Sequence, residues 1–414
     1  MKNDQIITSL IDDDRYTAVM GGFYTSNRRN FDTQFGYTLR SSSVVLVPYI
    51  DEIREQVNAL ATLHLSDAER DFLTRTLNPR DHGYIRRLAD DRLDPANELV
   101  IRVNPNVRGG LEIFTAPGLD IVKAGKYEMP VLAIISEIYN RARLGSKYDQ
   151  ALSVAKTVAS AKIDKVIDLV NRNPEVGYKF AEFGTRRRFS REFQEWLVCE
   201  MAGRLSPEIL LGTSNMRLGM LTGLNTVGTM GHQLIMSYQG FNDYGVSQYA
   251  ALVDLALHTG GDVLVLTDTL GQRMWDEDFD TWLARDFSGQ RHDSGCPIEW
   301  GHDRIAKYRE FGIDPKTKVL MFSDNLTVDS SFELSRLFVA QTNVIHGIGT
   351  HWTNDLDGFE GHKSLSQVFK LLYCNGKPVV KLSNDMDLKA QCPCPHTLEY
   401  VKAIAKGEIK GGLK

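Results

Sequence analysis

Residues 182–192 read Glu-Phe-Gly-Thr-Arg-Arg-Arg-Phe-Ser-Arg-Glu, with three consecutive arginines between two segments of different hydrophobic period. The preceding segment, 176–183, is short and rich in β-branched and aromatic side chains, which predicts a strand. Apolar side chains then recur at helical spacing, at Phe189, Phe193, Trp196 and Leu197. The stretch therefore predicts a strand, a polar turn and a helix.

The three arginines of this turn need partners of opposite charge. An unpaired buried charge is costly, so we expect that Arg186, Arg187 and Arg188 do not all lie in a core. The chain offers no anionic domain to meet them, which makes a small polyanionic substrate the natural candidate. Taken alone, the turn is equally consistent with a solvated basic loop.

The same pattern recurs along the chain, as short apolar strands that end in small polar residues and are followed by helical stretches. The expected strands are 179–183, 208–211, 226–227, 262–266, 287–290, 318–322 and 343–345. Seven such units predict a parallel sheet closed or nearly closed into an α/β barrel. The C-terminal ends of parallel strands share one face, so we expect the polar ends to converge there.

The polar ends that meet on this face carry more charge than helix capping requires. Capping explains the serines, threonines and asparagines. It does not explain the charged and imidazole side chains expected on the same face, which are Arg186, Arg187, Arg188, Asp268, Arg291, His292 and Asp293. A face of this composition indicates a site for a sugar phosphate.

The regions outside this repeat predict a second, smaller unit. Its expected elements are a helix at 51–61, strands at 99–103 and 111–113, and a hairpin of 369–374 and 377–382 around Asn375-Gly376. A lone hairpin is marginal in water, so we expect it to pack on the strands near 99–114. Helices are expected at 131–143 and 151–170. We predict an α+β domain from 1–120 plus 365–414 and an α/β-barrel domain from 121–364.

Composition excludes several classes of function. The chain has 414 residues, 42% of them hydrophobic and 24% charged, with a net charge of −5, which argues against broad nucleic-acid binding. No apolar run approaches the roughly 18 residues of a membrane span, and residues 1–5 lead into no signal peptide. Five cysteines without such a signal favour the cytoplasm. The run Cys392-Pro393-Cys394-Pro395-His396 lacks the spacing of a zinc site, so we predict no structural metal.

Individual loops suggest chemistry for this face. Residues 347–350, Gly-Ile-Gly-Thr, offer backbone N–H groups to a phosphate, and in the last loop of a barrel this reading is much stronger than in an isolated turn. Asp268 and Asp293 suit ribose hydroxyls or water-ligated Mg²⁺, although each alone is more often a cap or an ion-pair partner. Arg186 and Arg291 can each fork onto a carboxylate or phosphate. His232 is by default a satisfied polar residue, but on a polyphosphate-binding face it becomes a candidate for a phosphorylatable nucleophile.

The polar strand ends, taken together and in order, resemble those of the nicotinate phosphoribosyltransferase family. The matching segments are 14–16, 183–188, 212–215, 228–232, 291–295, 323–325, 347–350 and 373–378. The resemblance covers nearly the whole chain. It implies a transferase that joins nicotinate to phosphoribosyl pyrophosphate with Mg²⁺, giving nicotinate mononucleotide and pyrophosphate in NAD salvage. It also implies ATP hydrolysis coupled through a phosphohistidine at His232.

The resemblance also assigns roles to residues. It implies catalytic roles for His232, Arg186 and Asp293, the last two holding phosphoribosyl pyrophosphate. The pyridine ring would stack between Phe183 and a Tyr16 from a second subunit, which implies a homodimer with its site at the interface. The other implied substrate-binding residues are Thr185, Ser214, Asp268, Arg291, Ser294, Asn325, Gly347, Gly349 and Thr350. Of these, Ser214 and Arg291 would face the nicotinate carboxylate, and the last three would bind the 5′-phosphate.

Departures from the family pattern keep alternatives open. Cys296 stands where the family usually has Asp, which suggests a non-catalytic paralogue that binds phosphoribosyl pyrophosphate. Gly231 and Gln233 stand where bacterial members often have Ala and Glu, which bears on ATP coupling. A transferase using nicotinamide is the enzymatic rival, but relatives of that kind carry an acid at the Ser214 position. Quinolinate-using enzymes are shorter and lack this motif set.

Overall fold

Parallel strands form the sheet that the sequence predicts. The structure is a computed structural model that describes residues 5–27 and 29–409. In that part of the chain, six strands pair in parallel in the order β6-β5-β10-β9-β8-β7. Their bounds are β5 Phe180–Glu182, β6 Leu210–Thr213, β7 Leu264–Leu266, β8 Gly289–His292, β9 Val319–Phe322 and β10 Asn343–Ile348.

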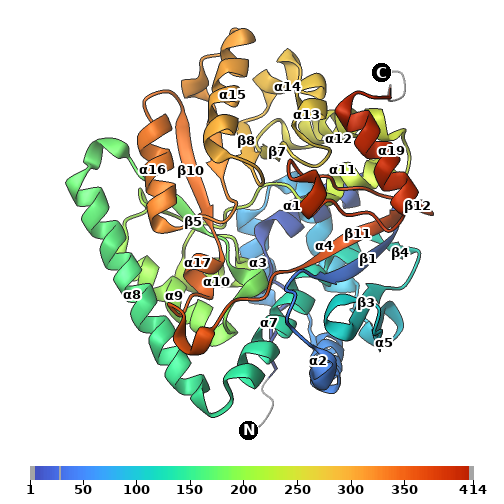
Figure 1. Cartoon of the computed structure of the whole chain (residues 1–414), viewed down its shortest axis with the longest axis vertical. Helices are drawn as coiled ribbons and strands as arrows, with labels where there is room; N and C mark the ends of the chain where they lie inside the picture. Colours follow the sequence, from blue (N-terminus) through green and yellow to red (C-terminus); the bar gives the residue numbers. More distant parts are fainter. Residues whose placement is uncertain (1–4, 28, 410–414) are drawn as a thin grey trace.

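Helices connect these strands and cover the sheet (Figure 1). They are α9 Arg191–Arg204, α10 Met216–Thr222, α11 Gln233–Tyr238, α12 Tyr244–Thr259, α13 Gln272–Asp278, α14 Thr281–Asp286, α15 Pro297–Glu310, α16 Val328–Phe338 and α17 Thr350–Thr353. The helix predicted after the three arginines is α9. The Ser190 hydroxyl caps its first turn by accepting from the Phe193 N–H at 3.1 Å.

The closed barrel is not seen. The seventh expected strand, 226–227, is reduced to a single parallel bridge between Thr226 and Thr213 at the β6 edge. Among the described residues, no pairing joins β7 to this bridge or to β6.

A second sheet joins the N-terminal region to the C-terminal hairpin. Within the described residues its order is β12-β11-β1-β3-β2, with β4 paired to β1, and all its pairs are antiparallel. The bounds are β1 Asp32–Leu39, β2 Leu99–Val103, β3 Leu111–Thr115, β4 Leu119–Asp120, β11 Gln367–Cys374 and β12 Lys377–Pro378. The sequence missed β1, which lies between the hairpin and β3. The hairpin therefore pairs with β1 and not directly with the strands near 99–114.

The hairpin turn has the predicted geometry. Asn375 and Gly376 have φ of 50° and 75°, the two positive values that a type I′ turn needs. The strand after it is shorter than predicted, because the chain leaves the ladder after Pro378 and Lys381 bridges to Gln391 instead.

The remaining helices surround the antiparallel sheet and the outer edge of the molecule. They are α1 Arg15–Ser26, α2 Ile50–Asn58, α3 Asp67–Thr76, α4 His82–Asp90, α5 Pro95–Glu98, α6 Ile121–Gly125, α7 Glu128–Leu144, α8 Tyr148–Arg172, α18 Met386–Lys389 and α19 Pro395–Lys406. The predicted helices at 51–61, 131–143 and 151–170 correspond to α2, α7 and α8. The long α8 runs along the periphery (Figure 1).

Two expectations about the whole chain concern its domain boundaries and membrane-spanning helices. The domain boundaries remain predictions, and their outermost parts, 1–4 and 410–414, lie outside the described residues. No helix in the described part of the chain combines the length and apolar character that crossing a bilayer requires.

Candidate active site

A cavity of about 610 Å³ lies where the C-terminal ends of the parallel strands face the antiparallel sheet. Its lining comes from the loops that follow the parallel strands, from the start of α1, and from the β1 and β11 region. Eight basic side chains line it, against five acidic ones. The basic ones are Arg40, Arg186, Arg187, Arg291, Lys363, Lys370, Lys381 and Lys389. A cavity of this charge suits a ligand with several negative charges.

Two of the aromatic rings that line the cavity, those of Tyr16 and Phe183, each have a guanidinium beside them. The guanidinium carbon of Arg186 lies 5.4 Å from the centroid of the Tyr16 ring, and that of Arg291 lies 5.7 Å from the centroid of the Phe183 ring. Glycines make room for both rings. A Cβ at Gly231 would lie 2.9 Å from Tyr16 Cε2, and one at Gly347 would lie 2.7 Å from Phe183 Cδ2.

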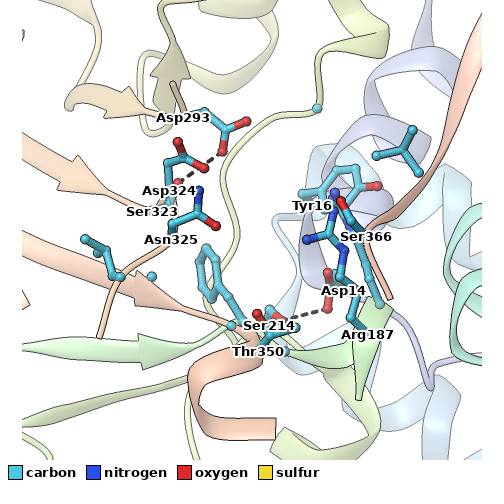
Figure 2. Close-up of a pocket in the computed structure, with 18 of the residues that line it drawn as sticks. Asp14, Tyr16, Arg187, Ser214, Asp293, Ser323, Asp324, Asn325, Thr350 and Ser366 are labelled. Atoms are coloured by element: carbon cyan, nitrogen blue, oxygen red, sulfur yellow. Dashed lines mark hydrogen bonds between the residues drawn. The ribbon is translucent and has the colours of Figure 1, made fainter. Parts of the chain in front are cut away.

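Asp14 and Ser214 form a buried pair in the cavity wall. The Ser214 hydroxyl donates to Asp14 Oδ1 at 2.6 Å. Figure 2 shows the two side chains pointing toward one another, across the cavity from Asp293, Asp324 and Asn325. Burial raises the pKa of the Asp14 carboxyl, although Arg186 and the hydrogen bond from Ser214 oppose the rise.

Arg291 organises the opposite wall through three hydrogen bonds. It donates to Thr229 Oγ1 at 2.7 Å, Ser323 Oγ at 2.8 Å and Asp293 Oδ1 at 3.0 Å. Burial by itself raises the pKa of the Asp293 carboxyl, but Arg291 and His232 outweigh burial and hold that pKa well below its usual range. Asp293 is therefore an anion at neutral pH.

His232 lies between Asp293 and Thr269. Its Nδ1 is 2.9 Å from Thr269 Oγ1, and its Nε2 is 3.2 Å from Asp293 Oδ2. Burial lowers the pKa of His232 to about 4, and Lys381 adds to the lowering. The ring is thus neutral at pH 7. Because an ionised carboxylate can only accept, Nε2 carries the proton and Nδ1 the lone pair.

Asp268 lies behind His232 and is fully buried. Its Oδ2 accepts from Ser294 Oγ at 2.7 Å and from Lys381 Nζ at 3.1 Å. Its Oδ1 has no hydrogen-bond partner and lies 3.8 Å from His232 Nε2. Donor atoms of His232, Asp268 and Asp293 all lie within 4.8 Å of one another, an arrangement that could hold a cation. Two carboxylates, one with a free oxygen, fit Mg²⁺, which prefers oxygen ligands.

The three arginines of residues 186–188 have different surroundings. Arg186 and Arg187 line the cavity. Arg188 is buried, and its two terminal nitrogens donate to the two oxygens of Asp12 at 2.8 and 2.9 Å. Burial, together with the neighbouring charges of Arg186 and Arg40, lowers the pKa of Arg187 to about 10. The turn therefore presents two closely spaced cations to the cavity, while the third holds the N-terminal segment in place.

Comparison with known proteins agrees with this geometry. The chain matches the model of the nicotinate phosphoribosyltransferase (NAPRTase) family over residues 178–405 and that of the NAPRTase N-terminal domain over residues 11–136. The chain belongs to the nicotinate phosphoribosyltransferase family. It is 35% identical to the Cupriavidus necator nicotinate phosphoribosyltransferase over 96% of this chain and 98% of that one. The Burkholderia mallei nicotinate phosphoribosyltransferase is 34% identical, with 96% of each chain covered.

Solved structures from this family of enzymes have the same fold. The crystal structure of a Vibrio cholerae nicotinate phosphoribosyltransferase matches with a TM-score of 0.87 and 31% identity, covering 100% of this chain and 96% of that one. A putative nicotinate phosphoribosyltransferase from Saccharomyces cerevisiae matches with a TM-score of 0.84 and 25% identity, covering 98% and 100%.

Most residues predicted for the site line the cavity. They are Tyr16, Phe183, Arg186, Ser214, His232, Arg291, Asp293, Asn325, Gly347, Gly349 and Thr350. Tyr16 of the same chain shares the cavity with Phe183, and the supply of a Tyr16 by a second subunit stays a prediction. The bridge between Asp14 and Asn215 holds the start of α1 against the end of β6 within one chain.

Three predicted residues lie behind the cavity wall. Asp268 and Ser294 support His232 and the segment after Lys381, since Ser294 Oγ also accepts from the Asn384 N–H at 3.0 Å. The Thr185 hydroxyl accepts from Gln194 at 3.2 Å and from Asn215 at 3.3 Å. The structure gives all three residues a supporting position.

His292 and Arg188 do not reach the cavity face, contrary to our expectation. Side chains alternate along a strand, so Arg291 and Asp293 face the cavity while His292 points the other way. The His292 ring is buried, 5.4 Å from the ring of Trp300 and 6.0 Å from that of Phe322.

Sequence reasoning missed several lining residues. Asp14 and Asp324 lay in the quoted motifs but received no role, and Arg40, Glu128, Lys363, Lys370, Lys381 and Lys389 carried no signal. Glu128 Oε1 is buried without a hydrogen-bond partner, 3.8 Å from Arg186 and 3.8 Å from Lys370. Burial lowers the pKa of Lys370 to about 8. These groups come from elements that no local pattern links to the repeat.

The departures from the family pattern lie in different places. Cys296 is exposed, does not line the cavity, and is the residue just before α15, where its side chain makes no capping hydrogen bond. A carboxylate at this position would interact with the start of a helix, outside the cavity lining. Gly231 and Gln233 do line the cavity, and Gly231 is the residue that Tyr16 packs against.

Proposed function

We propose that the protein transfers phosphoribose from phosphoribosyl pyrophosphate to nicotinate, giving nicotinate mononucleotide and pyrophosphate. The observation that carries this proposal is one cavity whose lining combines the aromatic rings of Tyr16 and Phe183 with eight basic side chains. A flat pyridine ring fits the first and a polyphosphate fits the second. Membership of the family supports the same reaction.

The pyridine ring would lie between Tyr16 and Phe183. Arg291, beside the Phe183 ring, would fork onto the nicotinate carboxylate, and Ser214 would donate to it. The ring nitrogen is already a nucleophile and needs no strong base. The loops therefore contribute chiefly by holding that nitrogen in line with C1′ of the ribose.

The phosphates would meet the basic side chains. Arg186 and Asp293 would hold phosphoribosyl pyrophosphate, and Gly347, Gly349 and Thr350 the 5′-phosphate. Loss of pyrophosphate leaves an oxocarbenium-like ribose, as in glycoside cleavage. Asp268 and Asp293 would hold Mg²⁺, which when bound neutralises the leaving pyrophosphate.

We also propose that ATP hydrolysis is coupled to the transfer through phosphorylation of His232. A neutral imidazole offers one nitrogen lone pair to a phosphoryl group, and the low pKa of His232, about 4, supports that state at pH 7. Asp293 and Thr269 orient the ring.

The test is mononucleotide formation by the purified protein with phosphoribosyl pyrophosphate and Mg²⁺, comparing nicotinate with nicotinamide, each with and without ATP. We expect product from nicotinate, stimulated by ATP, and a loss of the stimulation in His232→Ala. If neither pyridine yields product while phosphoribosyl pyrophosphate still binds, the protein is the non-catalytic paralogue. In that case Cys296→Asp should restore turnover.

We also propose that the protein assembles as a homodimer. Both Tyr16 and Phe183 of one chain line the cavity. Light scattering after size-exclusion chromatography decides the oligomeric state.

A further inference from the structure

The Asp14–Ser214 pair bears on which pyridine the cavity accepts. Both side chains are buried, with 6% and 4% of their surface exposed, and both line the cavity beside Tyr16. Their backbones are tied together, since the Arg15 N–H donates to the Ser214 carbonyl at 2.7 Å and Asp14 bridges to Asn215. The hydrogen bond between the two side chains is therefore a fixed feature of the wall.

A hydroxyl has one proton, and the pair uses it. When Ser214 donates to an ionised Asp14, the hydroxyl offers only lone pairs to the cavity. Lone pairs accept from the NH₂ of an amide but repel a carboxylate, and the charge on Asp14 adds to the repulsion. With Asp14 ionised, the Asp14–Ser214 pair therefore favours nicotinamide. Binding of nicotinate requires one additional proton on the pair.

The surroundings of Asp14 favour the uptake of that proton. The titratable groups that act on Asp14 are Arg186 of the arginine turn, Glu128 of α7, Glu182 of β5, and Asp13 and Tyr16 of its own segment. Arg186 is the one cation in this set, and the three carboxylates oppose it. A further negative charge, brought by a pyridine carboxylate, shifts the balance toward protonated Asp14.

We propose that Asp14 is the specificity-determining residue for the pyridine. Asp14 takes one proton from solvent as a pyridine carboxylate enters. The Asp14 O–H then donates to Ser214 Oγ, and the Ser214 O–H donates to the substrate carboxylate. This inference rests on the proposed function, because it concerns the choice between the acid and amide forms of the same ring. The cavity therefore selects the acid form of the pyridine only when Asp14 is protonated.

The test is isothermal titration calorimetry of the full chain with nicotinate and with nicotinamide, between pH 6 and 8.5, in buffers of different ionisation enthalpy. We expect nicotinate binding to take up protons, approaching about one as Asp14 of the free protein ionises. Nicotinamide binding should take up none. Where nicotinate binding takes up one full proton and nicotinamide binding takes up none, the ratio of nicotinate affinity to nicotinamide affinity falls roughly tenfold for each unit rise in pH. Effects common to both ligands, including titration of His232, cancel in this ratio.

The Asp14→Asn variant keeps the shape of the side chain and removes its charge. We expect this variant to bind nicotinate without proton uptake, with a flat affinity ratio. Asp324→Asn, which changes a carboxylate on the opposite wall, is the matched control and should retain the uptake. Nicotinate binding without proton uptake by the wild type at every pH overturns this inference and leaves the proposed function standing. Binding of neither pyridine overturns both.

Discussion

Removing Arg188 and removing its neighbour Arg187 should affect the stability of the protein to very different extents. Arg188→Ala leaves the Asp12 carboxylate buried without its cation, so we expect the free energy of unfolding to fall by about 3–5 kcal/mol. Arg187 repels Arg186 and Arg40 and donates one hydrogen bond, to the Gln367 carbonyl at 3.2 Å. Its removal should change stability by less than about 1 kcal/mol. Urea denaturation of both variants measures the difference, and equal losses would contradict the division of roles.

The residue before His232 should control the position of Tyr16. In Gly231→Ala the new Cβ would lie 2.9 Å from Tyr16 Cε2, so the ring must shift. We expect nicotinate affinity to fall roughly three- to tenfold, because the ring no longer stacks in place. The control is Gly203→Ala in α9, where no atom lies within 4 Å of the added Cβ. Titration of nicotinate into each variant checks the effect, and unchanged affinity would show that Tyr16 does not contact the ligand.

At the scale of elements, the contact between β10 and α16 should make stability depend on pH. His346 of β10 is fully buried, with Nε2 2.8 Å from the Ser335 hydroxyl of α16, and burial lowers its pKa to about 3. The unfolded chain binds a proton at His346 near pH 6.5, and the native chain does not until about pH 3. The contribution of neutral His346 is therefore complete above pH 6.5 and is lost as the pH falls toward 3.

This imbalance predicts a loss of about 2 kcal/mol in the free energy of unfolding between pH 7 and pH 5 from His346 alone. His346→Gln lacks the titrating group, so its pH dependence should be shallower by about that amount, whatever its stability at pH 7. Urea titrations at both pH values test this. Parallel pH profiles for the two proteins would contradict it.

Strand alternation explains which motif residues reach the cavity. The spacing of polar strand ends predicted all six parallel strands within a few residues and the convergence of their ends. It could not tell which side chain of Arg291-His292-Asp293 points where, since that depends on the register of β8 against β9 and β7. For the same reason His346, between the expected strand 343–345 and the loop 347–350, is a core residue.

For the molecule as a whole, the cavity is assembled within one chain. We expect no complementation between Tyr16→Ala and Phe183→Ala, two variants that each lose one aromatic ring of this cavity. If the tyrosine came from a partner subunit, mixing the variants would create one intact site in each mixed dimer and restore part of the activity. Because both rings line the cavity of a single chain, the mixture should stay as inactive as its components. The assay is mononucleotide formation after refolding the two variants together.

The sequence by itself determined the repeating strand and helix units and the Asn-Gly hairpin, because each is set by local periodicity and turn chemistry. The family resemblance added the site residues, most of which line the cavity. Only the tertiary structure decided the number of strands in the parallel sheet, the place of β1 between hairpin and β3, and the pairing of Arg188 with Asp12. It also decided that Arg40 and the lysines of the C-terminal region join the cavity. Those outcomes depend on contacts between distant segments, whose geometry is set by packing and charge pairing and leaves no local pattern.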